Sequence, residues 1–291
     1  MADTEARSSD PGSKKPSRAG RNLPAAIAVG VLLGGGLIAV LLLAPYVWIG
    51  VVAAAAAIGT VEVSRRLGEA GYVVPLVPLL LGGQATVWLT WPFGPAGALG
   101  GFAATVVVCM IWRLFAQGGA RPDGAAPTTY SRDIAATVFL ATWVPLFAAF
   151  GALLIYPADG PERVFALMLG VVFSDIGGYT AGVLFGRHLM VPTISPKKSW
   201  EGFAGSLLFG GTAATLAVVF LLDKPWWAGV ALGVMLVITG TLGDLVESQF
   251  KRDLGIKDMG TLLPGHGGLM DRIDAMLPSA VASWIVLTLL A

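Results

Sequence analysis

Apolar stretches of about 20 residues recur along most of this chain, and a helix of that length crosses the hydrocarbon core of a bilayer. Hydrophobic residues make up 55% of the sequence, and no polar segment after residue 22 is long enough to build a second core in water. We therefore expect an all-α polytopic membrane protein. Residues 1–22, rich in Ser, Gly, Pro, Lys and Arg, have the composition of a disordered cytoplasmic tail, and residues 23–291 should form a single membrane domain.

Breaks at Gly, Pro or charged residues divide that domain into about nine predicted transmembrane helices. They cover residues 23–44, 46–64, 72–91, 95–115, 134–156, 162–185, 202–222, 225–243 and 275–291. The helices up to residue 156 would form an amino-terminal part, and residues 160–291 the catalytic portion. Lys and Arg gather in alternate loops, so the positive-inside rule predicts a cytoplasmic amino terminus and a cytoplasmic site between the carboxyl-terminal helices. We expect an integral protein of the cell membrane.

The segment 248–274 is the most charged part of a chain in which only 13% of residues are charged. Its 27 positions hold four carboxylates, four basic residues and one histidine. Charge beside hydrocarbon is costly unless it binds a ligand or lines water, so metal ions and phosphates are the ligands we expect. The alternative is a solvated loop of Asp–Arg salt bridges.

Helical spacing brings several of these groups together. If the helix 225–243 continues into the cytoplasm, Asp244, Glu247, Ser248 and Lys251 lie on one stripe, because their spacings are 0, 3, 4 and 7. Asp271 and Asp274 are likewise three residues apart. Two such sets of oxygen atoms suit a hard divalent cation, which takes a few carboxylates plus phosphates and waters.

A second set of polar residues lies within and after the apolar run 162–185. Asp175 is an ionisable residue within the membrane region, which is a functional-site hypothesis by default; a structural ion pair or a hydrogen-bonded helix contact is the alternative. The segment that follows offers hydroxyl and ammonium groups, which are phosphate ligands by type, at Ser195, Lys197, Lys198 and Ser199.

The charged segment resembles the signature of the phosphatidate cytidylyltransferase family, the integral-membrane enzymes that make CDP-diacylglycerol. The resemblance rests on the pattern Ser248-x-apolar-Lys251-Arg252, then Lys257-Asp258-x-small, then Pro264-x-His266-Gly267-Gly268-apolar-x-Asp271-Arg272-apolar-Asp274. The stretches Ser174-Asp175-x-x-Gly178-Tyr179 and Ser195-Pro-x-Lys198-Ser199-x-Glu201-Gly202 are similar to the same family, except that Gly178 stands where the family usually has Ala. The resemblance covers residues 160–291, and residues 1–133 match only as a hydrophobic profile.

This resemblance implies attack of a phosphatidate oxygen on the α-phosphorus of CTP, which gives CDP-diacylglycerol and pyrophosphate. Because the nucleophile is already an anion, the protein must mainly bring the phosphates together and offset their repulsion. The implied cofactor is Mg²⁺, with a second cation left open, and the implied metal ligands are Asp175, Asp244, Asp271 and Asp274. The implied catalytic residues are Lys251, His266, Asp271 and Arg272. The implied substrate-binding residues are Ser195, Lys197, Lys198, Ser199, Ser248, Arg252, Lys257, Gly267 and Gly268.

The expected partners are CTP, phosphatidic acid and the membrane lipid, and the resemblance also suggests a homodimer. A net charge of +1 with dispersed basic residues does not indicate a nucleic-acid-binding surface.

His266 has a structural alternative, hydrogen bonding within its loop. Two rival functions remain: a CTP-dependent lipid-alcohol kinase, and a transporter with Asp175 on an ion pathway.

Overall fold

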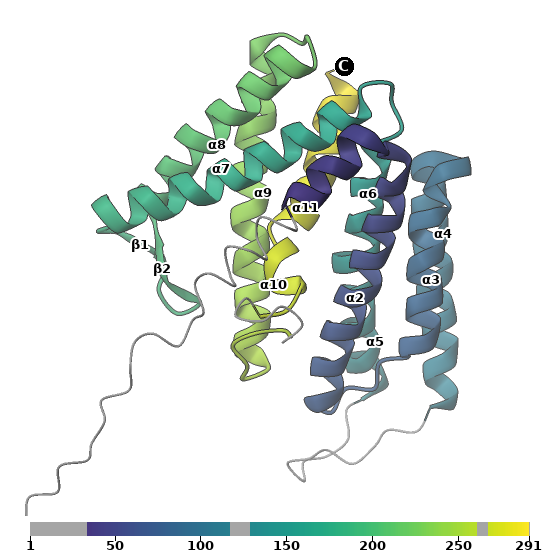
Figure 1. Ribbon diagram of the computed structural model, residues 1–291. Coiled ribbons are helices and arrows are strands. Elements are labelled where there is room, and N and C mark those ends of the chain that lie inside the picture. Colours follow the sequence, from purple (N-terminus) through teal and green to yellow (C-terminus); the bar gives the residue numbers. More distant parts are fainter. Residues whose placement is uncertain (1–33, 117–128, 261–266, 291) are drawn as a thin grey trace, which may run out of the picture.

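Helices account for most of the structure, a computed structural model that describes residues 34–116, 129–260 and 267–290 (Figure 1). The predicted tail 1–22 and the first part of the predicted helix 23–44 lie outside the described residues. The amino-terminal part consists of the helix Gly34–Leu43, the turn η1 (Pro45–Val47), α2 (Trp48–Glu69), α3 (Leu76–Trp88), α4 (Thr90–Phe115), α5 (Tyr130–Ala141), the π-helical turn η2 (Thr142–Leu146) and α6 (Phe147–Leu153). The carboxyl-terminal part consists of α7 (Gly160–Phe185), β1 (Leu189–Val191), β2 (Ser195–Ser199), α8 (Trp200–Leu221), α9 (Trp226–Asp253), α10 (Met270–Ile273) and α11 (Met276–Leu289).

Seven helical segments of the described residues are long and apolar enough to cross a membrane. Two further apolar helices, Gly34–Leu43 and Leu76–Trp88, are shorter. The helical, polytopic character of the chain is therefore as predicted. The count of nine spans and their orientation stay predictions.

The structure corrects the predicted elements at three places. The all-α prediction omitted the antiparallel hairpin of β1 and β2. The predicted break between residues 91 and 95 is a kink inside α4, where Gly94 has a φ of 57° and precedes Pro95. The predicted helix 134–156 begins earlier, at Tyr130, and contains the π-helical turn around Pro145, whose missing amide cannot continue a regular α-helix.

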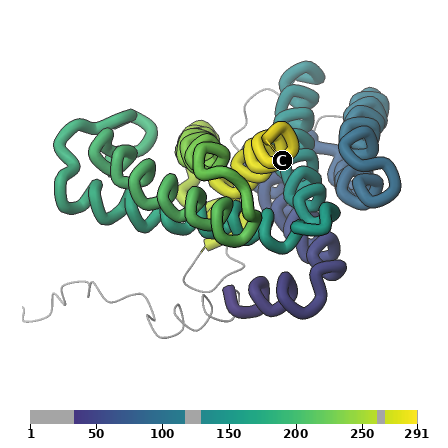
Figure 2. The backbone as a smooth tube through the Cα atoms, turned by 90° about the horizontal axis from the view of Figure 1, so that it is seen from above, coloured from purple at the N-terminus to yellow at the C-terminus, as the bar shows by residue number. Residues whose placement is uncertain are grey.

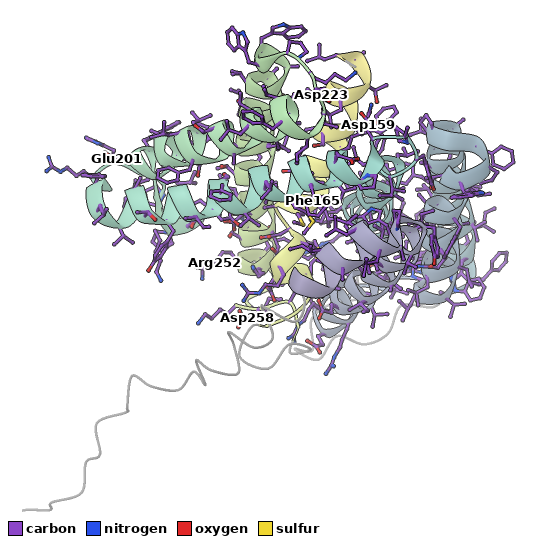
Figure 3. All side chains as sticks on the ribbon, turned by 45° about the horizontal axis from the view of Figure 1, so that its top comes forward. Asp159, Phe165, Glu201, Asp223, Arg252 and Asp258 are labelled. Carbon is purple, nitrogen blue, oxygen red and sulfur yellow. The ribbon has the colours of Figure 1, made fainter. Side chains whose placement is uncertain are left out.

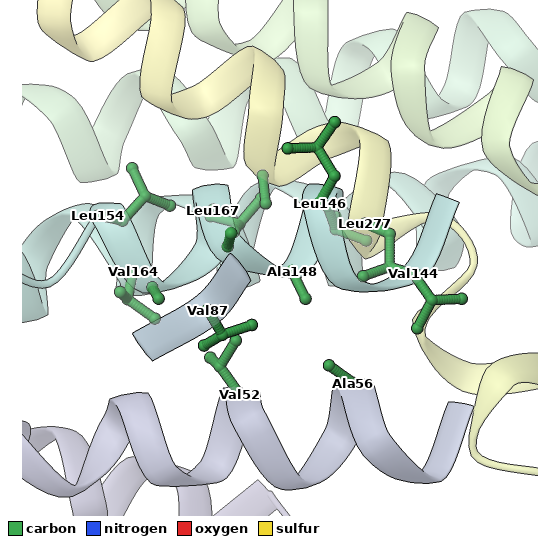
Figure 4. Packing of buried hydrophobic residues seen from close by; sticks show 14 of the residues in the cluster. Val52, Ala56, Val87, Val144, Leu146, Ala148, Leu154, Val164, Leu167 and Leu277 are labelled. Carbon is green, nitrogen blue, oxygen red and sulfur yellow. The ribbon is translucent and has the colours of Figure 1, made fainter. Parts of the chain in front are cut away.

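One hydrophobic core joins the two parts of the chain. Figure 4 shows Val52 and Ala56 of α2 facing side chains from α3, η2, α6, α7 and α11. The buried side chains drawn there include Val87, Val144, Leu146, Ala148, Leu154, Val164, Leu167 and Leu277. Because α2 and α11 pack into the same core, the amino-terminal helices take part in placing the carboxyl-terminal ones.

Helices α7 and α8 pack at unusually close range. A Cβ atom added at Gly177 would lie 2.5 Å from the carbonyl oxygen of Gly205, and one at Gly205 would lie 2.5 Å from the carbonyl oxygen of Gly177. Only glycine permits this approach of two helix backbones. Seen from above, the two helices run side by side away from the rest of the molecule (Figure 2), and the hairpin that joins them lies beside α9 (Figure 1).

The charged loops lie at two opposite ends of the bundle. Figure 3 places Arg252 and Asp258 at one end and Asp159 and Asp223 at the other. The end with Arg252 holds the carboxyl end of α9, so the predicted continuation of this helix beyond residue 243 is confirmed up to Asp253.

Candidate active site

A cavity of about 460 Å³ lies between α7, the β1–β2 hairpin, α8, α9 and the α10–α11 segment. Its wall mixes carboxylates, ammonium groups, hydroxyls and glycines, which suits phosphate groups better than an apolar ligand. Nine of the predicted site residues line it: Asp175, Ser195, Lys197, Lys198, Ser199, Asp244, Lys251, Asp271 and Asp274. Segments up to 99 positions apart in sequence therefore meet at one place, as the predicted site requires.

Lys198 connects the hairpin to α9. Its Nζ lies 2.7 Å from Oδ2 of Asp244 and donates to the carbonyl oxygen of Thr241 at 3.3 Å. Ser248 donates to Oδ1 of the same Asp244 at 3.2 Å, which confirms the predicted stripe on α9. The neighbouring Lys197 is exposed at the cavity and has no ion-pair partner among the described residues, so its ammonium group is available to an anion.

Side-chain contacts with the start of α8 hold the hairpin in place. Ser199 Oγ accepts a hydrogen bond from the amide of Gly202 at 3.1 Å and so caps α8. Glu201 accepts from the amides of Arg187 and His188, both at 3.2 Å, and its Oε1 lies 2.6 Å from Nδ1 of His188. These hydrogen bonds fix the ends of the hairpin against α8, and the hairpin presents Lys197 and Lys198 to the cavity.

Lys251 lies between two acidic groups on the other side of the cavity. Its Nζ is 3.0 Å from Oδ1 of Asp271 and 3.4 Å from Oε1 of the buried Glu247. The Asp271 carboxylate also accepts from the amide of Met259, at 3.1 and 3.0 Å to its two oxygens, and from the amide of Gly268 at 2.8 Å. These donors use most of the lone pairs that a carboxylate offers. Asp271 thus organises the surrounding backbone, and its predicted metal ligation stays a prediction.

Three other carboxylates remain for a cation. Asp175, Asp244 and Asp274 line the same cavity, although no three His, Cys, Asp or Glu side chains within the described ranges are already grouped closely enough to hold an ion. An all-oxygen donor set of this kind fits Mg²⁺, which keeps waters and takes one or two carboxylates together with substrate phosphates. The residues present are therefore compatible with the predicted cofactor.

The remaining predicted residues do not line the cavity directly. Arg252, Lys257 and Arg272 are exposed, and Gly267 and Gly268 belong to the backbone beside Asp271. His266 lies outside the described residues. Tyr179 is an aromatic residue of the cavity wall.

Two residues of α2 reach this region and were not predicted as site residues. Glu62 accepts from the amides of Leu269 and Met270, and Arg66 donates to the carbonyl oxygen of Met259. The available signal was the pair of charges one helical turn apart at the end of an apolar run. A basic residue at the end of an apolar run is also what the positive-inside rule predicts, so the sequence alone does not distinguish the two roles of Arg66.

Helices long and apolar enough to span a membrane, together with a cavity lined by lysines, carboxylates and hydroxyls, indicate an integral membrane protein with a polar site. The sequence matches the cytidylyltransferase family over residues 24–290, and the chain belongs to that family. A phosphatidate cytidylyltransferase of Mycobacterium bovis is 64% identical over 278 residues, which cover 94% of this chain and 91% of that protein. One of Mycobacterium leprae is 62% identical over 285 residues, covering 96% of this chain and 91% of its own. One of Staphylococcus aureus is 42% identical over 122 residues, covering 41% of this chain and 46% of the other.

Proposed function

We propose that the protein is a metal-dependent enzyme that transfers the cytidylyl group of CTP to phosphatidate. The observation that carries this proposal is the identity of 62–64% to phosphatidate cytidylyltransferases over nearly the whole chain. The cavity that gathers the lysines of the hairpin and the carboxylates of three other segments supports it, because it offers the groups that a reaction between two phosphates needs.

In the proposed reaction, a phosphate oxygen of phosphatidate attacks the α-phosphorus of CTP. A new P–O–P bond forms, the bond from the α-phosphorus to the oxygen that bridges to the β-phosphorus breaks, and pyrophosphate leaves with that electron pair. The attacking oxygen is already an anion, so no strong base is needed, and the main task is to offset the repulsion between two anionic substrates.

The lysines of the cavity would carry that task. Lys197 and Lys198 lie on the hairpin and are the proposed ligands of the lipid phosphate. Lys251 lies on the other side of the cavity, where it pairs with Asp271, and is the proposed ligand of the triphosphate. Arg252 and Arg272, which follow Lys251 and Asp271 in the sequence, are proposed to assist it. Placing cations on both sides lets the two phosphates approach each other.

A bound Mg²⁺ would be held by Asp175, Asp244 and Asp274 and would neutralise charge that develops on the phosphates. A second cation is part of the same proposal.

We also propose that the protein lies in the cell membrane with this cavity on the cytoplasmic side, where CTP is made, and that it forms a homodimer. Light scattering of the detergent-solubilised protein after size exclusion tests the oligomeric state.

The reaction is tested with purified protein in detergent, phosphatidate, Mg²⁺ and CTP labelled at either the α- or the γ-phosphate. We expect the α-label in the lipid fraction, as CDP-diacylglycerol, and the γ-label in pyrophosphate. A γ-label in the lipid fraction, with CDP as the soluble product, would instead identify a lipid kinase. Protein with Asp244→Asn provides the matched control for contaminating activity.

A further inference from the structure

Helix α2 holds the backbone on both sides of the segment 261–266. Oε1 of Glu62 accepts from the amide of Leu269 at 3.0 Å, and Oε2 accepts from the amide of Met270 at 2.9 Å. Arg66 Nε donates to the carbonyl oxygen of Met259 at 2.8 Å. The partners are 193 to 208 positions apart in sequence, so these bonds connect the amino-terminal helices to the charged segment.

Glu62 and Arg66 are directed at this backbone and not at each other. Glu62 and Arg66 are one helical turn apart, a spacing at which opposite charges commonly pair. Here Arg66 instead pairs with Glu69, with Nη1 2.8 Å from Oε2, and Glu62 accepts from two backbone amides. Such carboxylate–amide bonds are charge-assisted and stronger than bonds between neutral groups.

The same backbone is held from the opposite direction by Asp271. The amide of Met259 donates to Asp271 while its carbonyl oxygen accepts from Arg66. The amide of Gly268 donates to Asp271, and the next two amides donate to Glu62. Asp271 in turn binds Lys251, which lines the cavity. A continuous series of contacts thus leads from α2 to the cavity wall.

Close approach at Gly268 supports the same arrangement. A Cβ atom added there would lie 2.7 Å from Oε2 of Glu62 and 2.6 Å from the amide nitrogen of Gly260. Glycine is therefore needed at this position, because a Cβ atom would clash with the backbone of Gly260 and displace the carboxylate of Glu62 from its two amides.

We propose that Glu62 and Arg66 are positioning residues for the reaction: by fixing the backbone at Met259 and at residues 268–270, they hold Asp271 and through it Lys251 in the orientation needed for phosphate transfer. We call the hydrogen bonds of Glu62 and Arg66 to the backbone of Met259, Leu269 and Met270 the clamp. The positioning of Lys251 for catalysis rests on the proposed function, whereas the existence of the clamp does not.

The clamp is tested by hydrogen–deuterium exchange on the full-length protein in detergent. Glu62→Gln keeps the size of the side chain but offers one acceptor oxygen, so one of its two amide partners loses its bond. We expect about 10-fold faster exchange in the peptide that contains Leu269 and Met270, the ratio expected for one lost hydrogen bond. The matched control is Arg65→Ala, on the same helix, where a side chain that is 76% exposed pairs with Glu69 and with no other acid of the described residues. Unchanged exchange in Glu62→Gln would overturn the clamp, whatever the protein catalyses.

Positioning is tested by kinetics on the same preparations. For the folded fraction we expect Glu62→Gln to lower kcat about 10- to 100-fold, because small misplacements of reacting groups are costly, while Arg65→Ala keeps wild-type kcat. Arg66→Lys, which retains the charge, should lose less and supplies a second variant if Glu62→Gln does not fold. Normal kcat in the folded fraction of both variants would reduce α2 to a structural support and overturn the proposal.

A double variant separates action through Lys251 from an independent effect. If Glu62 acts by holding Lys251, then Glu62→Gln combined with Lys251→Met should be no slower than Lys251→Met alone. Multiplied losses would contradict the proposed route. If the wild-type protein forms no CDP-diacylglycerol, the proposed function fails, and the exchange measurement still decides whether the clamp exists.

Discussion

Several contacts of the site converge on Asp271. Its carboxylate receives the ammonium group of Lys251 and the amides of Met259 and Gly268, and its side chain is only 8% exposed. In Asp271→Asn an amide nitrogen would replace one acceptor oxygen and face a backbone donor. We therefore expect loss of turnover and an unfolding free energy that is lower by about 1–3 kcal/mol, with a correspondingly lower Tm. Unchanged thermal stability would contradict this organising role.

Asp244 provides the matched comparison at the same scale. It is 42% exposed at the cavity and pairs with Lys198, and such accessible pairs add little to stability. Asp244→Asn should therefore abolish turnover or raise the Mg²⁺ requirement steeply, with a Tm near that of the wild type. A Mg²⁺ titration and a melting curve on one preparation provide both readings, and normal Mg²⁺ dependence would remove Asp244 from the proposed metal site.

Lys197 differs from its neighbour because no acid neutralises it within the described residues. Lys197→Ala should raise the KM for phosphatidate several-fold, increasingly so at low salt, and should leave the KM for CTP and the Tm nearly unchanged. An effect confined to the KM for CTP would assign Lys197 to the nucleotide instead.

At the scale of the element, the packing of α7 against α8 determines the position of the β1–β2 hairpin that joins them. Gly205→Ala would drive a methyl group into the backbone of Gly177, and overpacking of this kind costs about 1–3 kcal/mol. Gly211→Ala on the same helix is the control, since a Cβ atom there meets nothing within 4 Å. We expect a lower Tm for the first variant and an unchanged or slightly higher Tm for the second. Equal melting temperatures would show that the close packing is not needed.

The apolar helices and the shared face of the polar residues on α9 could be predicted from the sequence, because they follow hydrophobicity and helical spacing. The stripe from Asp244 to Lys251 depends only on 3.6 residues per turn, and α9 carries it as predicted. The hairpin was not predicted because β1 has only three residues, β2 is largely polar, and their pairing depends on how α7 and α8 meet. The contacts of Glu62 could not be predicted from the sequence either, since they are made to backbone amides 207 and 208 positions away.

At the scale of the whole molecule, the cavity and the charged end of α9 lie together, and Asp159 and Asp223 lie at the opposite end (Figure 3). The positive-inside rule predicts that the first end is cytoplasmic. This can be tested with single cysteines at Lys257→Cys and Lys224→Cys after replacement of Cys109, which is buried and 1% exposed. Lys257→Cys should resist an impermeant thiol reagent in intact cells and react after permeabilisation, whereas Lys224→Cys should react from outside. Labelling of Lys257→Cys in intact cells would place the cavity on the outer side, away from cytoplasmic CTP, and would contradict both the orientation and the proposed reaction.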